Sequence, residues 1–141
     1  MTVYVKRLKI VTFTIGGNSF DCQLQSWSLD YGVKDGDRLY SYCSAGEGQN
    51  VAISETDPEP TLDLKFYSDW RSAGISDYLT ANNGQVAAFV LDHHTDLVGA
   101  HVQWSGNVVL KIGAIGGDAR ATEMTEVTLQ VVGTPTYTRI G

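Results

Sequence analysis

An alternation of apolar and polar residues with a period of two recurs along this chain and restricts the folds open to it. Residues 61–67 (TLDLKFY) and 126–132 (EVTLQVV) both follow it. Successive side chains of a strand point to opposite faces of a sheet, so this spacing predicts strands with one buried face. Fifteen glycines among 141 residues supply turns between such strands. The chain is therefore expected to be mainly β and to form a single domain over residues 1–141.

The same pattern places the other strands of this domain. Residues 86–91 are apolar on both faces, which predicts a central strand. A change of phase at Gln25-Ser26 predicts a β-bulge in the second strand. The C-terminal residues 133–141 contain one proline and no periodicity, and are predicted to be irregular. Further strands are expected at residues 8–15, 20–31, 97–104 and 108–112, with turns at Gly16–Asn18 and Ser105–Asn107.

One segment departs from the strand pattern. After Ser68-Asp69 the apolar residues fall at helical intervals, which predicts a helix at about residues 70–79. Ser68 or Asp69 can cap its start and Gly84 can end it. The residues expected to pack the helix on the sheet are Trp70, Ile75, Tyr78 and Leu79. These elements predict a β-sandwich or partly closed barrel with one flanking α-helix.

A long segment at residues 32–60 interrupts this order. It is rich in Gly, Asp and Glu, its only strand-like piece is residues 38–43, and Pro58 and Pro60 close it. A connection of this length in a compact domain is usually functional. We call residues 32–60 the arm.

Charge is distributed unevenly along the chain. The net charge is −6, and residues 30–60 carry seven acids against two bases, whereas residues 1–9 carry Lys6, Arg7 and Lys9. Without clustered Lys and Arg elsewhere, a nucleic-acid-binding face is not expected. Two interpretations of the acidic segment stay open. It is either a solvated loop, or a surface that repels DNA or pairs with a basic patch on a neighbour.

The N-terminus and the cysteines bear on the compartment. Basic residues precede an apolar stretch, but Thr12 and Thr14 interrupt it and no small-residue cleavage site follows, which favours a strand over an export signal. We therefore expect assembly in a reducing cytoplasm and no insertion of this chain into a membrane. Cys22 continues an apolar alternation, so a free buried thiol is expected, with a Cys22–Cys43 disulfide as the alternative.

Motifs for catalysis or metal binding are weak. His93-His94, with Asp92, Asp96 and His101 nearby, is the one metal-like cluster, yet neighbours on a strand point to opposite faces, which favours a polar loop. The string GAIGGD at residues 113–118 lacks the Lys-Ser/Thr of a P-loop. Carbohydrate binding by tryptophans is conceivable, but two of the three alternate in phase with aliphatic residues, which favours core packing. The expectation is a non-enzymatic protein without a catalytic site, metal or cofactor.

Specific strings go further than periodicity. "FTIGGNSFDCQLQSWSL", "LDLKFYSDW", "ISDYLTANNG", "GAIGGDA" and "VTLQVVGTPT" occur in this order. Together they resemble the major tail proteins, or tail tube proteins, of long-tailed bacteriophages, particularly those that infect actinobacteria. The resemblance covers most of the chain outside the arm.

This resemblance implies a fold and a function. The family fold is a β-sandwich with one helix on its flank, and its subunits form six-fold rings that stack into the tube through which the genome is delivered. The chain would then be a structural virion protein of the tail, assembled in the host bacterial cytoplasm. Its partners would be further copies of itself, the tail terminator and baseplate proteins, and, inside the lumen, the tape-measure protein and viral DNA without sequence-specific binding.

The resemblance also assigns roles to segments. The arm would reach the next subunit or the next ring, and the helix would close the open end of the sandwich on the outer side. The residues expected at such contacts are Asp35, Asp37, Arg38, Tyr40, Tyr42, Glu47 and Glu55 of the arm, with Lys6 and Arg7. Two alternatives remain: another ring-forming tail component, such as a terminator or a secretion-tube-like protein, and a carbohydrate-binding β-sandwich module. The host, the symmetry number, tail contractility and the lumen-facing strands stay open.

Overall fold

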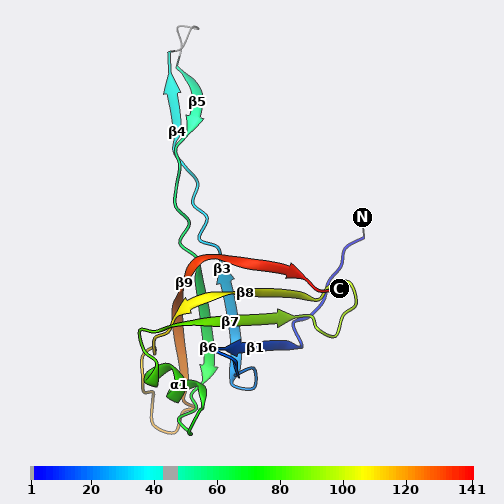
Figure 1. Ribbon diagram of the computed structural model, residues 1–141, viewed down its shortest axis with the longest axis vertical. Helices are drawn as coiled ribbons and strands as arrows, with labels where there is room; N and C mark the ends of the chain where they lie inside the picture. Colours follow the sequence, from blue (N-terminus) through cyan, green and yellow to red (C-terminus); the bar gives the residue numbers. More distant parts are fainter. Residues whose placement is uncertain (1, 43–47) are drawn as a thin grey trace.

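The computed structural model describes residues 2–42 and 48–141, and the protein is mainly β with one short helix (Figure 1). This confirms the predicted fold class, in its partly closed form. Two residues of the sequence predictions, Cys43 and Glu47, lie outside the described residues. The elements are β1 (Val11–Ile15), β2 (Asn18–Ser19), β3 (Leu24–Asp30), β4 (Arg38–Ser41), β5 (Gln49–Ile53), β6 (Thr61–Tyr67), α1 (Ile75–Ala81), β7 (Val86–His93), β8 (Val102–Val109) and β9 (Met124–Arg139).

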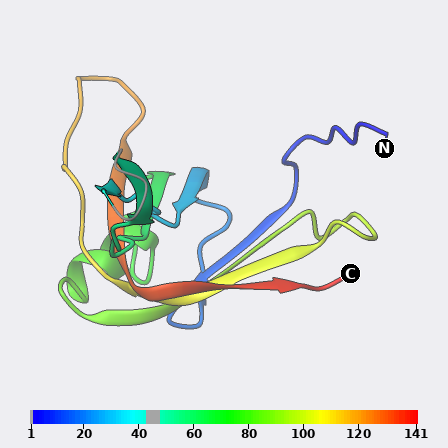
Figure 2. The same ribbon diagram turned by 90° about the horizontal axis from the view of Figure 1, so that it is seen from above.

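Seven of the strands form one antiparallel sheet that curls into a half-barrel. Their order is β2-β1-β7-β8-β9-β6-β3, so β7 lies between two neighbours, as its apolar sequence predicts. In Figure 2 the strands β3 and β6 stand away from the layer formed by β7, β8 and the end of β9. The two parts of the sheet face each other across the core.

The bend that makes this half-barrel is in β9. Its first half pairs with β6, from Tyr67↔Met124 to Thr61↔Gln130, and its second half pairs with β8 as far as Val102↔Arg139. Gly133 at the bend has a φ of 75°, a conformation that glycine adopts without strain. The prediction that residues 133–141 are irregular is therefore wrong. The bend breaks the local alternation, but the strand continues because β8 offers it a second partner.

A second correction concerns β8. The sequence predicts two strands with a turn at Ser105–Asn107, whereas residues 102–109 form one strand. Gly106 lies opposite Phe89 on β7. A Cβ at position 106 would come within 3.1 Å of the Phe89 ring. The glycine therefore makes room for an aromatic ring inside a strand rather than marking a turn.

The N-terminal hairpin is largely as predicted. β1 and β2 pair around the Gly16-Gly17 turn, and the register of β3 shifts between Leu24 and Ser26, which confirms the bulge. However, residues 21–23 form a turn instead of beginning the strand. Cys22 is therefore exposed, and the prediction that it is buried is wrong.

Side chains from both layers and from α1 fill the half-barrel. The fully buried residues include three phenylalanines, which are the largest side chains of this core. α1 lies at one end of the sheet (Figure 1) and contributes Ile75 and Leu79 to the same core. The principal members of this core are Phe13, Ile15, Leu62, Phe66, Ile75, Leu79, Phe89, Leu91, Leu110 and Leu129.

Candidate functional site

The arm is a β-hairpin that projects from the body. β4 and β5 form a separate two-stranded sheet, from Arg38↔Ile53 to Ser41↔Gln49. Figure 1 shows this hairpin held away from the half-barrel on two extended segments. The sequence predicted a strand near β4 but missed β5, because residues 49–53 mix polar and apolar residues without a clear period.

Polar contacts join the two extended segments. Gly32 accepts a backbone hydrogen bond from Glu59, and the Nζ atom of Lys34 lies 3.0 Å from a carboxylate oxygen of Glu59. Further along, the N–H of Asp37 donates to the hydroxyl of Ser54 over 2.7 Å, and the N–H of Ser54 donates to the Asp37 carbonyl. The arm is thus a paired ribbon along the part of its length that the structure describes.

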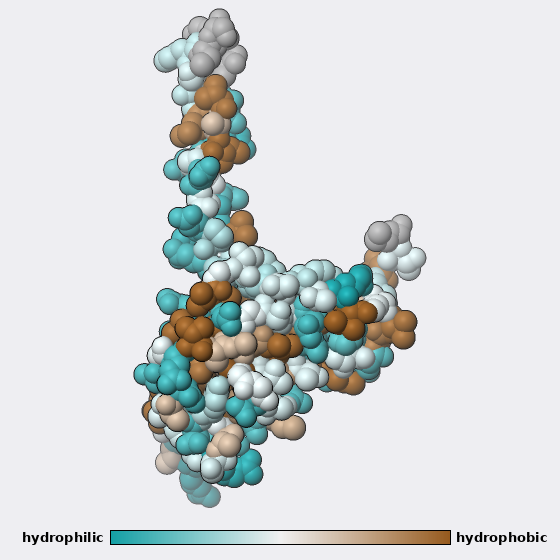
Figure 3. Space-filling model, in the orientation of Figure 1, coloured by the Kyte–Doolittle hydropathy of each residue, from teal (hydrophilic) through white to brown (hydrophobic). Residues whose placement is uncertain are grey.

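Several apolar side chains of the arm are exposed, because the arm has no core in which to bury them. Tyr40, Tyr42 and Ile53 expose 64%, 76% and 61% of their surface. Figure 3 shows brown apolar residues gathered on the outer part of the arm, above a largely teal stem. A monomer gains nothing from displaying such residues in a group, and exposed apolar groups of this kind mark interaction sites. Val33, Leu39 and Val51 are exposed in the same way.

The charged residues predicted for this site fall into two separate places. Asp35, Asp37, Arg38 and Glu55 are exposed on the arm. Lys6 and Arg7 are exposed in the N-terminal segment, which leaves the body on a different side (Figures 1 and 2). In the described part of the chain, no ion pair joins these bases to an acid of the arm. The folded chain therefore presents an acidic projection and a basic segment apart from each other.

Of the four residues predicted to pack the helix on the sheet, three do so and one does not. Ile75 and Leu79 are fully buried, and the half-buried Tyr78 packs its ring against Phe20 with centroids 5.4 Å apart. Trp70 lies before α1 and is 42% exposed, so its assignment to helix packing is wrong. Its indole N–H instead donates to Glu123 over 3.0 Å.

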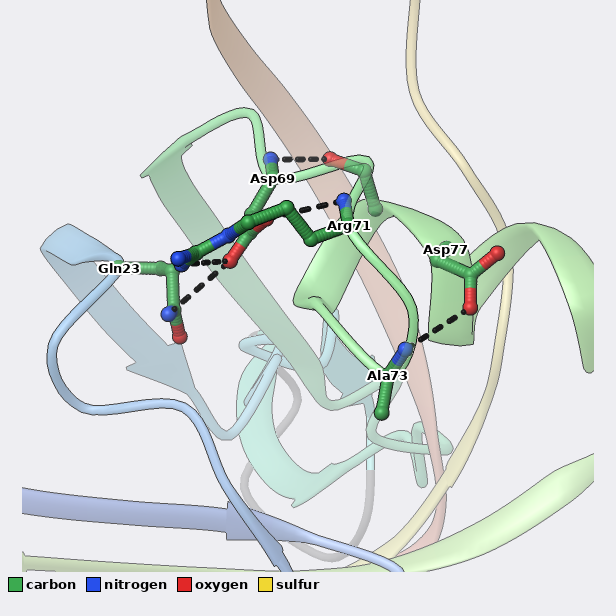
Figure 4. Close-up of polar contacts among 6 residues, drawn as sticks. Gln23, Asp69, Arg71, Ala73 and Asp77 are labelled. Carbon is green, nitrogen blue, oxygen red and sulfur yellow. Dashed lines mark hydrogen bonds and ion pairs between the residues drawn. The ribbon is translucent and has the colours of Figure 1, made fainter.

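A polar cluster that the sequence did not indicate organises the start of α1 (Figure 4). The carboxylate of Asp69 accepts hydrogen bonds from Arg71 and from the side chain of Gln23. These bonds, first of all the one from the Arg71 side chain, lower the pKa of Asp69 to about 2. The helix begins after Gly74, and the Asp69 backbone carbonyl receives the N–H of Ser76, so the predicted side-chain cap by Ser68 or Asp69 is wrong. The cluster serves the fold.

One surface groove of about 540 Å³ lies over β3, β6 and β9, and its charged side chains are paired. Within it Lys65 and Glu126 form an ion pair at 3.4 Å, and the hydroxyl of Thr128 donates to Asp63 over 2.6 Å. Among the described residues, no group of three or more His, Cys, Asp or Glu side chains could hold a metal ion. The arm is therefore the more informative surface.

Comparison of the chain with protein-family models, with curated proteins and with solved structures found no match. Within the described residues, the one helix is too short to cross a lipid bilayer.

Proposed function

We propose that the chain is the subunit of a self-assembling tube, a tail tube protein that forms stacked, six-fold rings in the tail of a long-tailed bacteriophage. The observation that carries this proposal is the projecting arm with its exposed apolar residues. An arm that cannot pack on its own body is suited to the body of another copy. Contacts of this head-to-tail kind propagate into open-ended assemblies.

The unpaired edges of the sheet support the same proposal. β3 ends the strand order, and β2 covers two residues at the other end. Free strand edges are prone to pair with other chains unless the fold protects them. In a ring of half-barrels, pairing between neighbouring copies would remove both edges.

One face of the sheet fits the lining of a DNA channel. The strand pairing places alternate residues of β1, β7, β8 and the second half of β9 on the face opposite the core. Asp92 is the one charged residue of this set, and none is Lys or Arg. DNA is held by neutralisation of its phosphates, so such a face would let it slide. The set is Thr12, Thr14, Val86, Ala88, Val90, Asp92, Gln103, Ser105, Asn107, Val109, Thr136 and Thr138.

Negative-stain electron microscopy of the concentrated protein, with its elution volume, tests the proposal. Open tubes of stacked rings are the expected result. Isolated rings that do not stack would favour the alternative of a terminator-like or secretion-tube-like component. A persistent monomer that binds a glycan saturably would overturn the proposal in favour of a carbohydrate-binding module.

A further inference from the structure

Histidines and tryptophans gather where β7 ends and β8 begins. His93 is the last residue of β7, and His94 and His101 stand at the two ends of the connection between these strands. Trp104 comes from β8 and Trp27 from β3. The cluster therefore joins both layers of the half-barrel, through the contact of Trp27 with His93.

One hydrogen bond sets the protonation of His93. The indole N–H of Trp104 donates to Nε2 of His93 over 3.0 Å. Because Nε2 accepts this bond, the neutral ring carries its proton on Nδ1. The His93 ring also meets the edge of Trp27 and lies beside His94, with centroids 5.4 Å and 4.9 Å apart.

A second proton on His93 has no place in this arrangement. It would sit on Nε2 and point at the N–H of Trp104, so that two donors would face each other. The Nδ1 atom is already buried without a hydrogen-bond partner among the described residues. An imidazolium here would have no acceptor for either proton, which is costly for a partly buried cation.

The surrounding charges mostly oppose protonation as well. Burial lowers the pKa of His93, and His94 and His101 lower it further, whereas Asp92 acts in the opposite direction. Arg139 of β9 lines the same hollow as His93, together with Tyr4 of the N-terminal segment, and its guanidinium donates to the carbonyl of Gly99. Trp27 brings no charge from β3.

We propose that the His93–Trp104 hydrogen bond is an acid-sensitive latch, which holds the Trp104 indole against the end of β7 at neutral pH and releases it when His93 is protonated. Backbone pairing of His93 with Val102 holds the two strands together independently of this bond, so the released group is the Trp104 side chain. This inference concerns the folded subunit and does not depend on the proposed assembly.

Amide and indole hydrogen exchange, followed by NMR between about pH 7.5 and pH 4.5, tests the latch. After correction for the intrinsic exchange rate, opening at the Trp104 indole is expected to rise up to about tenfold for each pH unit below the ordinary histidine pKa. Core amides such as that of Phe89 are expected to stay protected over the same range. Uniform loss of protection would indicate global acid unfolding and overturn the latch.

Two variants separate His93 from its neighbours. His93→Gln keeps an acceptor for Trp104 but cannot be protonated, so the acid-induced opening is expected to disappear. The double variant His94→Gln/His101→Gln is the matched control and is expected to keep the opening, with its midpoint at higher pH because two repelling groups are gone. Unchanged opening in His93→Gln, or no opening in the wild-type protein, would rule the latch out.

Discussion

The guanidinium of Arg71 meets the carboxylate of Asp69 through two nitrogens, with Nε to Oδ1 and Nη2 to Oδ2 both at 2.9 Å. The carboxylate is nearly buried, whereas Arg71 is largely exposed. Asp69 also accepts a hydrogen bond from the side chain of Gln23, which lies in the turn before β3. A single acid thereby ties the turn before β3 to the loop that leads into α1.

Replacing Asp69 should make the free energy of unfolding vary less with pH in the acid range. The folded-state pKa of about 2 lies below the ordinary value of 3.8, so the contribution of the carboxylate is complete above that value and is lost as the pH falls toward 2. Asp69→Asn should therefore lower the free energy of unfolding at neutral pH, and the gap to wild type should close toward pH 2. Urea unfolding at several pH values measures this gap. Asp118→Asn, an exposed control, should show no such convergence; a gap that stays constant with pH would contradict the prediction.

Gly106 is required by the ring of Phe89. Gly106→Ala would place a methyl group 3.1 Å from that ring and should lower the free energy of unfolding by about 1–3 kcal/mol. The control is Gly117→Ala, because a Cβ there meets nothing within 4 Å. Chemical denaturation of both variants measures the difference, and equal stability of the two would show that β8 accommodates a side chain at position 106.

The exposed thiol of Cys22 should react in the folded protein. Because Cys22 is free and exposed, a Cys43→Ser variant should form a mixed disulfide with a disulfide reagent without denaturant and release one equivalent of the reagent's thiolate. The rate should be close to that of the unfolded chain, measured spectrophotometrically on unassembled protein. A thiol that reacts only after denaturation would contradict the exposed position.

The apolar residues of the arm should matter for assembly and not for folding. Tyr40→Ser/Ile53→Ser should change the stability of the monomer by roughly 0.5 kcal/mol or less, because both side chains are exposed. The same variant should lose tubes in electron micrographs. Val98→Ser is the matched control, since Val98 is an exposed apolar residue outside the arm. Loss of tubes in both variants, or in neither, would contradict a specific role of the arm.

The charges of the arm should act between copies. Asp35→Lys/Asp37→Lys should weaken assembly if these acids meet Lys6 and Arg7 of a neighbour, and adding Lys6→Glu/Arg7→Glu should restore it. Added salt should weaken assembly of the wild-type protein, because exposed ion pairs are screened. Sedimentation of assembled material measures each effect. Unchanged assembly of the charge-reversed arm would count against this pairing.

The strands that alternate regularly could be predicted from local sequence. Residues 61–67 and the first half of β9 form strands as predicted, and the hairpin and the bulge of β3 are also in place. Where glycine or proline interrupts the alternation, local sequence misleads. Gly106 and Gly133 both predict the end of a strand, yet each lies inside a strand that pairs with a neighbouring strand.

For the candidate site, too, the sequence predicts some features and misses others. Composition alone indicated that residues 32–60 do not belong to the core, because glycine, acids and two prolines cannot fill it. It could not indicate the pairing of β4 with β5, the separation of the arm from Lys6 and Arg7, or the His93–Trp104 contact. Each of these depends on where segments far apart in sequence come to lie.

Local sequence is enough to predict the class of the fold, since a period of two commits segments to strands with one buried face. The acidic composition of the arm is likewise read directly from the sequence. Local sequence does not predict the path of β9 across both layers, the exposure of Cys22 or the neighbours of His93. Strand pairing and ring packing are non-local. They depend on which partner offers hydrogen bonds and space, and no window of neighbouring residues contains that information.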